Sequence, residues 1–468
     1  MNRRTNLIYV LADQLRYQSV GYAGDPRART PNLDEFARRG VNFCNAVSGH
    51  PVCAAYRASL LTGKYTTSTG MVINELRMNP NHECIGHVLT RNGYDTSYIG
   101  KWHLYANQLG NHTDPKNSFT PPGPHRLGFD GFWASYGFNH EYYKGYYHTD
   151  SPEQIPVEGY EPDFQTGLAI DRIEKHARGD KPFALFLSVG TPHSPWGRDN
   201  APPEYLAMFE KDTELGGFAL PANYKPDNDP YSDNWGKFRN PGERASIPDW
   251  LRVYYAMTAN LDWNFGRILK AVEKAGIADE TIIVFTSDHG EMMGSQGRLA
   301  KNIFYEEAVR VPFLVRCPSG GARVSDACLN TSDIMPTLLS MMGLPIPKKV
   351  EGVDLSHCAY GKPGPEPEAS FMQNTGACAS WDEGFEWRAL RGKQYTYAVY
   401  RVDRKELLFD HQADPCQLHN LADAGHRDVL ERHRVLLKTR MEALGDTFEA
   451  SAWYRDHWTE DRVITYVR

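Results

Sequence analysis

The segment NLIYVLA, residues Asn6–Ala12, indicates the fold, and the polar pair Asp13 and Gln14 follows it directly. Such a short, almost continuously apolar run is typical of a strand buried on both faces of a parallel sheet. Similar runs lie further along the chain, at Tyr94–Gly100 (YDTSYIG), Pro182–Gly190 (PFALFLSVG), Thr281–Ser287 (TIIVFTS) and Val311–Cys317 (VPFLVRC). Because helical patterns separate them, we predict an α/β fold with a large, mostly parallel sheet covered by helices on both faces.

Three of these helical patterns have clear ends. The first begins after Thr30, with Pro31 in its first position, and stops at Gly40. This fits the preference for proline at helix starts and glycine at helix ends. The other two helices are expected at residues 85–92 and 249–275.

The C-terminal quarter has a different pattern. Residues 199–248 and 345–367 are rich in Pro, Gly and polar residues and are expected to form a long excursion and a linker. After the linker, the patterns predict strands at 395–400 and 405–410 and a helix at 427–444. We therefore expect a main α/β domain at residues 1–367 and a small antiparallel α+β subdomain at residues 368–468.

Composition limits the classes of partner. The 468 residues carry a formal net charge of −7 without a basic stripe, so no nucleic-acid partner is expected. No apolar run reaches the roughly 18–20 residues of a membrane span. The eight cysteines include no CxxC pair, which argues against a zinc knuckle or a disulfide framework, and the first apolar run is too short for a signal peptide. We expect a soluble, cytoplasmic protein of undetermined oligomeric state; the alternative is an exported protein whose signal has been removed.

Polar side chains follow the predicted strands, at the carboxyl edge where parallel sheets bind ligands. Asp13 and Gln14 follow the first strand, and Asp288 and His289 follow the fourth. Two carboxylates, an amide oxygen and an imidazole suit a divalent cation such as Ca²⁺, Mg²⁺ or Mn²⁺, and the imidazole favours a transition metal somewhat. Each residue taken alone has a plainer interpretation, since a carboxylate after a strand is often a helix cap.

Cationic and imidazole side chains belong to the same group of positions. Lys101 and His103 follow the second strand and His193 follows the third. Together with Arg57 and Lys301, the lysine could hold a tetrahedral oxyanion, and the histidines could donate hydrogen bonds or act as general acids. The alternatives are a solvated Lys301 and structural histidines.

The segment HPVCAAYRASLLTGKY, His50–Tyr65, places Cys53 four residues before Arg57 at the start of a helical pattern. A lone cysteine is usually a small buried hydrophobe. Here, however, Cys53–Arg57 matches C-x-[P/A]-x-R, the maturation signature of formylglycine-dependent sulfatases, and the chain resembles that family within the alkaline phosphatase superfamily. Further family-like segments occur in the expected order, at 30–40 (TPNLDEFARRG), 93–103 (GYDTSYIGKWH), 285–291 (FTSDHGE), 306–315 (EEAVRVPFLV) and 407–422 (LLFDHQADPCQLHNLA).

The resemblance implies a mechanism for hydrolysis of an O-sulfate ester. A separate maturase oxidises Cys53 to formylglycine, whose hydrate carries two hydroxyl groups. One hydroxyl attacks sulfur and expels the alcohol; the other loses its proton, and sulfate leaves as the aldehyde reforms. The family's metal-ligand positions correspond to Asp13, Gln14, Cys53, Asp288 and His289. The positions that activate the hydrate, hold sulfate or protonate the leaving oxygen correspond to Arg57, Lys101, His103, His193 and Lys301.

Departures from the family pattern leave alternatives open. Ala55 replaces the commoner proline, and Tyr56 replaces a small residue, which bears on recognition by the maturase. Gln14 stands where many members have aspartate, and His289 where many have asparagine, so the site has one negative charge fewer. Ca²⁺ is the first expectation, with Mn²⁺ or Mg²⁺ as alternatives. Relatives with such variants cleave phosphonate monoesters and phosphodiesters, which is the alternative activity; a non-catalytic sulfate-binding protein with unmodified Cys53 is another.

A tyrosine-rich segment, WASYGFNHEYYKGYYHTD at Trp133–Asp150, indicates the substrate class. Aromatic faces with hydrogen-bonding tips suit a sugar ring, although a packed surface loop is the plainer alternative. We therefore predict a sulfated saccharide as substrate. The candidate substrate-binding residues are Trp102, Trp196, His140 and Tyr143.

Overall fold

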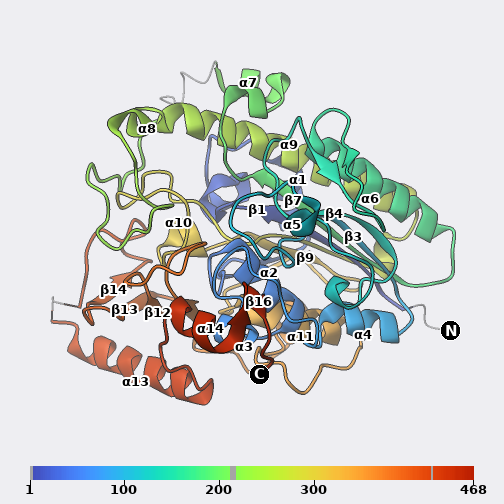
Figure 1. Cartoon of the computed structure of the whole chain (residues 1–468). Helices are drawn as coiled ribbons and strands as arrows, with labels where there is room; N and C mark the ends of the chain where they lie inside the picture. The colour runs from blue at the N-terminus through green and yellow to red at the C-terminus, as the bar shows by residue number, and fades with distance from the viewer. Residues whose placement is uncertain (1–3, 211–217, 423–424) are drawn as a thin grey trace.

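The computed structural model describes residues 4–210, 218–422 and 425–468. Its centre is an eight-stranded sheet with the order β10-β2-β9-β8-β1-β7-β3-β4 (Figure 1). The strands are β1 (Asn6–Asp13), β2 (Val41–Phe43), β3 (Asp95–Lys101), β4 (Phe132–Tyr136), β7 (Phe183–Pro192), β8 (Thr281–Ser287), β9 (Phe313–Arg316) and β10 (Arg323–Ser325). All five predicted strands lie in this sheet.

The sheet is parallel at its centre. Strand β1 pairs in parallel with β7 and β8, and β3 pairs in parallel with β7 and β4. Strand β9 runs antiparallel to both β8 and β2. Every residue of β1, β7 and β8 is buried, which explains their continuous apolar sequences and confirms the predicted fold class.

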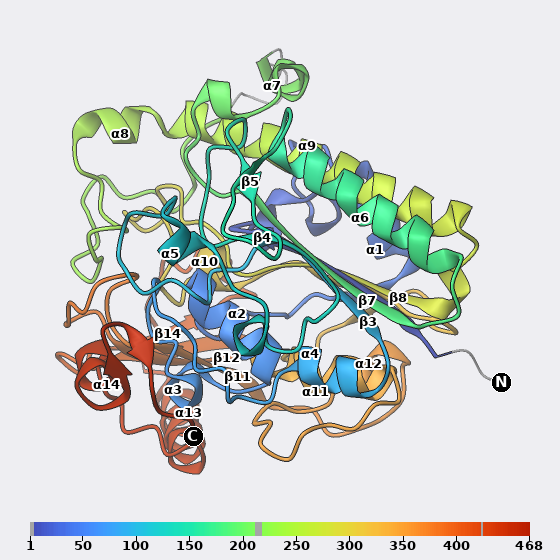
Figure 2. The same cartoon turned by 45° about the vertical axis from the view of Figure 1, so that its right-hand side comes forward.

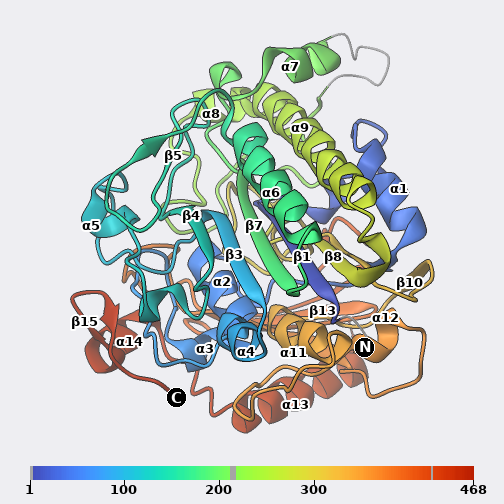
Figure 3. The ribbon, with the colours of Figure 1, turned by 90° about the vertical axis from the view of Figure 1, so that its right-hand side faces the viewer.

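Helices cover both faces of the sheet (Figures 2 and 3). One face packs against α1 (Pro31–Arg39), α6 (Glu161–Ala177) and α9 (Ile247–Lys274). The other packs against α2 (Cys53–Thr62), α4 (Ile85–Arg91) and α11 (Thr331–Met341). Shorter helices are α3 (Thr66–Thr69), α5 (Pro115–Ser118), α7 (Pro203–Glu210), α8 (Pro241–Ala245), α10 (Glu306–Val309) and α12 (Ser356–Ala359). The two-stranded pairs are β5 (Tyr146–Tyr147) with β6 (Ile155–Pro156) and β15 (Thr459–Glu460) with β16 (Val463–Ile464).

The C-terminal part forms a four-stranded antiparallel sheet. Its strands are β11 (Ala369–Asn374), β12 (Trp387–Gly392), β13 (Tyr395–Tyr400) and β14 (Glu406–Asp410), in that spatial order. Helix α13 (Arg427–Ala443) packs against one side of this sheet, and α14 (Ser451–Trp458) follows. Side chains of β12, β13 and β14 also join a core cluster with Phe304 and Tyr305. The small sheet therefore packs against the main domain, while the boundary at residue 367 stays a prediction.

Two further properties follow from the described residues. None of their helices combines the length and the apolar composition needed to cross a membrane. All eight cysteines are free thiols.

Candidate active site

Three strand ends and one helix start bring the predicted polar residues together. Asp13 is the last residue of β1 and Lys101 the last of β3, while Asp288 and His289 follow β8 directly. Cys53 is the first residue of α2. Because β1, β3 and β8 point in the same direction, these side chains meet at the carboxyl edge of the sheet.

The Cys53 thiol lies at the centre of this cluster. Its Sγ is 3.2 Å from His289 Nε2, 3.4 Å from Lys301 Nζ and 3.9 Å from Asp13 Oδ1. Burial and Asp13 raise the pKa of the thiol, whereas Lys101, Lys301 and His289 lower it, and the result is a pKa of about 7. Nearby cations thus hold the pKa of Cys53 below its usual value, whereas burial raises the pKa values of other buried thiols, such as Cys84 and Cys378.

Four residues of the cluster fit a cation. One donor atom from each of Asp13, Cys53, Asp288 and His289 lies within 4.8 Å of all the others. His289 donates from Nδ1 to the Gly290 carbonyl at 3.0 Å, so the lone pair of Nε2 faces the other donors, as a metal ligand requires. The mixture of oxygen and nitrogen donors suits a divalent cation.

Gln14, the fifth predicted ligand, uses both the nitrogen and the oxygen of its side-chain amide in hydrogen bonds. Its Nε2 donates to the Glu291 carboxylate, and its Oε1 accepts a hydrogen bond from Lys301 at 2.9 Å. The backbone of Gln14 adopts a φ of 69° and donates to Asp288 at 3.0 Å. The structure therefore places Gln14 in the cluster with its oxygen toward Lys301.

Two buried lysines contact the cluster. Lys101 donates to the Asp13 carboxylate, and its Nζ is 3.2 Å from His140 Nε2. Burial raises the pKa of Asp13, but Lys101 and the neighbouring histidines lower it by more, so the pKa lies well below its usual range. Lys301 contacts Cys53 and lies 2.8 Å from His193 Nε2. Both ammonium groups lie close enough to Cys53 to lower the pKa of its thiol.

Arg57 supports the cluster from within the core. Its Nη1 donates to the Lys101 carbonyl at 2.7 Å and to Ser188 Oγ at 2.6 Å, and its Nη2 donates to Asp288 Oδ2 at 3.2 Å. Its side chain is only 2% exposed. The guanidinium group thus orients Asp288 and the end of β3.

His193 is held in one tautomer. Nδ1 donates to the Ser194 carbonyl at 2.8 Å, and Nε2 accepts from Lys301. Burial, His140 and Lys301 place the pKa of His193 well below its usual range, so the ring is neutral at pH 7. His140, predicted as a substrate-binding residue, instead stacks on His193 with ring centroids 3.8 Å apart and borders Lys101.

His103 depends on two residues that the sequence did not single out. Its Nε2 is 3.0 Å from Glu75 Oε1, and burial raises the pKa of Glu75 to about 7. Phe138 packs against His103 and His140, and Lys101 Nζ lies 4.6 Å above its ring. Phe138 belongs to the tyrosine-rich segment, whereas no local signal marks Glu75.

The structure corrects the role predicted for Trp102. Its ring is 1% exposed and packs against Tyr98 and Trp133 in the core, so it does not face a sugar. Trp196 packs on Tyr254, whose hydroxyl bonds the Gln14 carbonyl at 2.7 Å, and so borders the cluster. Tyr143 is 42% exposed and packs on Tyr160, apart from the cluster.

The fold and this site fit a hydrolase of the alkaline phosphatase superfamily, and comparison with known proteins shows that it acts on sulfuric esters. The family model described as Sulfatase matches residues 5–344, and one described as N-sulphoglucosamine sulphohydrolase, C-terminal, matches residues 294–445. The chain belongs to the sulfatase family.

Individual relatives extend this result. An ulvan-active sulfatase of Formosa agariphila is 36% identical over 462 residues, with 96% of this chain and 84% of the relative covered. An endo-4-O-sulfatase of Bacteroides thetaiotaomicron is 30% identical over 511 residues, with 98% and 95% covered. A solved structure from the same species, from work on the metabolism of multiple glycosaminoglycans, superposes with a TM-score of 0.82 at 28% identity and covers 99% of this chain and 100% of that one.

Proposed function

We propose that this sulfatase hydrolyses an O-sulfate ester of a saccharide, using formylglycine formed from Cys53 and one divalent cation. The observation that carries the proposal is the placement of Cys53 within 3.9 Å of a carboxylate, an imidazole and an ammonium group. The names of the relatives, with ulvan and glycosaminoglycans among them, support a saccharide.

The residues that would hold the cation are Asp13, Asp288 and His289, with residue 53 as a further donor. A bound cation would supply Lewis acidity, lowering the pKa of a hydroxyl group at residue 53 and drawing charge from sulfate. Ca²⁺ is the ion we assign because three of the four donors are oxygens once residue 53 carries a hydroxyl group; elemental analysis of purified protein would distinguish it from Mn²⁺ or Mg²⁺.

The remaining residues act on the sulfate and the leaving alcohol. Lys101 and Lys301 neutralise the sulfate oxygens, and Arg57 keeps Asp288 in place. His193 and Lys301 are assigned together to proton transfer to the alcohol oxygen. The His193 ring is neutral, so the proton comes from the Lys301 ammonium group, which lies 2.8 Å from His193 Nε2. His103 is the second imidazole available for this role.

The first test is the mass of the peptide that contains Cys53, from protein made with and without a co-expressed maturase. Formylglycine or its hydrate would support the nucleophile. A thiol that persists beside an active maturase would contradict it and favour a non-catalytic sulfate-binding protein.

The second test compares kcat/KM for a matched aryl sulfate, phosphonate monoester and phosphodiester. A preference of tenfold or more for a phosphorus ester would replace the sulfatase assignment by the alternative activity. The maturase as partner and the cytoplasmic localisation stay predictions, which co-expression and cell fractionation test.

A further inference from the structure

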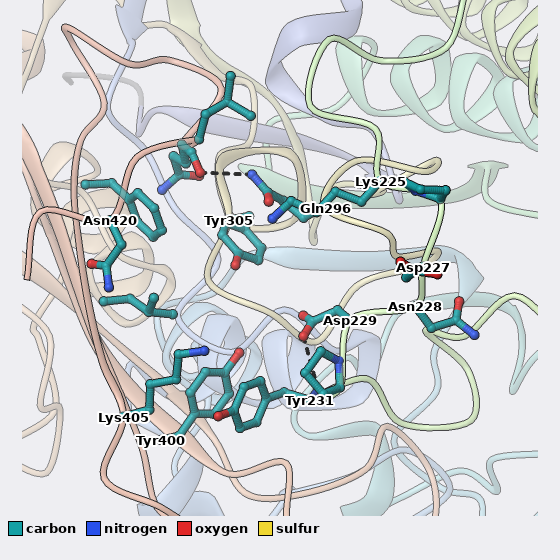
Figure 4. A pocket seen from close by; sticks show the side chains of 16 residues that line it. Lys225, Asp227, Asn228, Asp229, Tyr231, Gln296, Tyr305, Tyr400, Lys405 and Asn420 are labelled. Atoms are coloured by element: carbon teal, nitrogen blue, oxygen red, sulfur yellow. Dashed lines mark hydrogen bonds between the residues drawn. The ribbon is translucent and has the colours of Figure 1, made fainter. Parts of the chain in front are cut away.

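A cavity of about 410 Å³ lies between the C-terminal sheet and two loops of the main domain (Figure 4). One wall is formed by β14 and the turn before it, including Lys405 and Phe409. The facing walls come from residues 225–231 and from Gln296 and Tyr305. This volume lies within the usual range of small-molecule sites.

Two residues that line the cavity each have one buried amide atom without a hydrogen-bond partner in the described structure: Gln296 Oε1 and Gln417 Nε2. Their orientations are set by other bonds. Gln296 Nε2 donates to the carbonyls of Cys416 and Gln417 at 2.9 and 3.0 Å, and Gln417 Oε1 accepts from the Glu306 backbone at 2.9 Å. Both side chains are 2% exposed. One free acceptor and one free donor match hydroxyl groups, which can both donate and accept.

The cavity also presents two tyrosine hydroxyls and two lysines. Figure 4 shows the hydroxyls of Tyr305 and Tyr400 and the Lys405 ammonium group directed toward the same space. Among the described residues, neither Lys405 nor Lys225 has a carboxylate partner, whereas Asp229 is paired with Arg298 at 2.9 Å. The lining holds Lys225 and Lys405 against Asp227 and Asp229, and because Asp229 is already paired with Arg298, the two ammonium groups are available to an anionic group on the ligand.

We propose that this cavity is a second saccharide site, which binds a sulfated sugar unit of the polymer whose sulfate ester is cleaved at Cys53. The proposal rests on the saccharide substrate proposed above. The Tyr305 and Tyr400 hydroxyls and the two amides bond its hydroxyl groups, and Lys405 and Lys225 pair with its sulfate. The loop from Glu291 to Lys301 contributes to both places, because Gln296 reaches the cavity and Lys301 contacts Cys53.

Binding of sulfated oligosaccharides tests the proposal directly. The probes are ulvan and chondroitin sulfate oligosaccharides and the same preparations after chemical desulfation, each titrated into the whole protein by calorimetry. We expect Lys405→Ala to raise the Kd of a sulfated probe at least tenfold and Tyr305→Phe to raise it severalfold. Lys270→Ala is the matched control, since Lys270 is an exposed lysine on α9, away from the cavity. Its Kd should equal that of the wild type.

Activity separates this proposal from the proposed function. Lys405→Ala should leave kcat/KM for an aryl sulfate within twofold of wild type while lowering kcat/KM for the bound oligosaccharide at least fivefold. Wild-type protein that binds no sulfated probe, equal Kd values for Lys405→Ala and wild type, or equal binding of desulfated probes would each overturn the second site. Failure of formylglycine-containing protein to cleave aryl sulfate would instead overturn the proposed function. The calorimetric comparison would still show whether the cavity binds sulfated saccharides.

Discussion

Replacing Asp288 by asparagine tests the cation site most directly. The carboxylate accepts backbone hydrogen bonds from Gln14 at 3.0 Å and His289 at 2.9 Å, and a third from Arg57 at 3.2 Å. Asparagine keeps the shape but removes one of the two carboxylate charges beside Cys53. The amide of asparagine has one oxygen acceptor in place of two, so either Arg57 or the backbone N–H donors lose their hydrogen-bond acceptor.

The expected loss can be estimated from Coulomb's law. Two unit charges about 4 Å apart attract by about 4 kcal/mol at an effective dielectric constant of about 20, and a divalent cation doubles this to about 8 kcal/mol. If desolvation and rearrangement offset two thirds of that attraction, about 2.7 kcal/mol remains, which corresponds to roughly hundredfold weaker binding. We therefore expect the Kd for Ca²⁺, Mg²⁺ or Mn²⁺ to rise at least hundredfold in Asp288→Asn.

Calorimetric titration of metal-free protein measures this change, and aryl sulfate turnover across a range of metal concentrations shows whether excess cation restores activity. Asp262→Asn is the matched control. Asp262 is also buried and accepts backbone bonds, from Asn32 at 3.2 Å and Leu33 at 2.7 Å, but it lies outside the cluster. Unchanged Kd and rate in Asp288→Asn would refute the reasoning. An equal loss in both variants would show general destabilisation instead.

Three other substitutions give independent tests. Cys53→Ala should lower aryl sulfate turnover by at least about 10⁴-fold with little change in the urea unfolding midpoint; retained activity would locate the nucleophile elsewhere. Glu75→Gln should flatten the pH dependence of the free energy of unfolding. In the wild type, the Glu75 pKa of about 7 in the folded state lies above that in the unfolded chain, so the free energy of unfolding falls by roughly 3 kcal/mol between about pH 5 and 7. An equal change of the free energy of unfolding with pH in both proteins, measured by urea unfolding, would contradict this. Arg388→Met should lower the free energy of unfolding by about 3–5 kcal/mol, because it leaves Asp446 buried without its cation; a urea-unfolding loss under about 1 kcal/mol would show that the pair contributes little.

The sequence predicted the features that depend on neighbouring residues. Asp13 and Asp288 directly follow continuous apolar strands, so their position at the carboxyl edge follows from the topology of a parallel sheet. The role predicted for Trp102 was wrong because successive side chains at a strand end point in opposite directions. Lys101 points into the cluster, and the next side chain, Trp102, therefore points into the core. Adjacency to a site residue therefore does not imply a place in the site.

Features that depend on distant partners could not be predicted. Strand β12 has no apolar pattern because Arg388 and Arg391 are buried in it, and each is matched by a carboxylate far along the chain, Asp446 and Glu306. The role of Glu75 likewise arises only from its contact with His103. Such pairs have no local periodicity, so only the folded structure shows them.

The buried charges around Cys53 connect cation binding with sulfate binding. They are Arg57, Lys101 and Lys301 against Asp13 and Asp288. Among these five side chains the excess is one positive charge, which a divalent cation would raise to three; the buried Glu291 carboxyl beside Gln14 can offset part of it. An uncompensated buried charge of that size is costly, and a sulfate ester would offset it. Many sulfatases carry a carboxylate at the position of Gln14, so the positive excess here is one charge larger than in those relatives. The cation and the sulfate ester should therefore strengthen each other's binding.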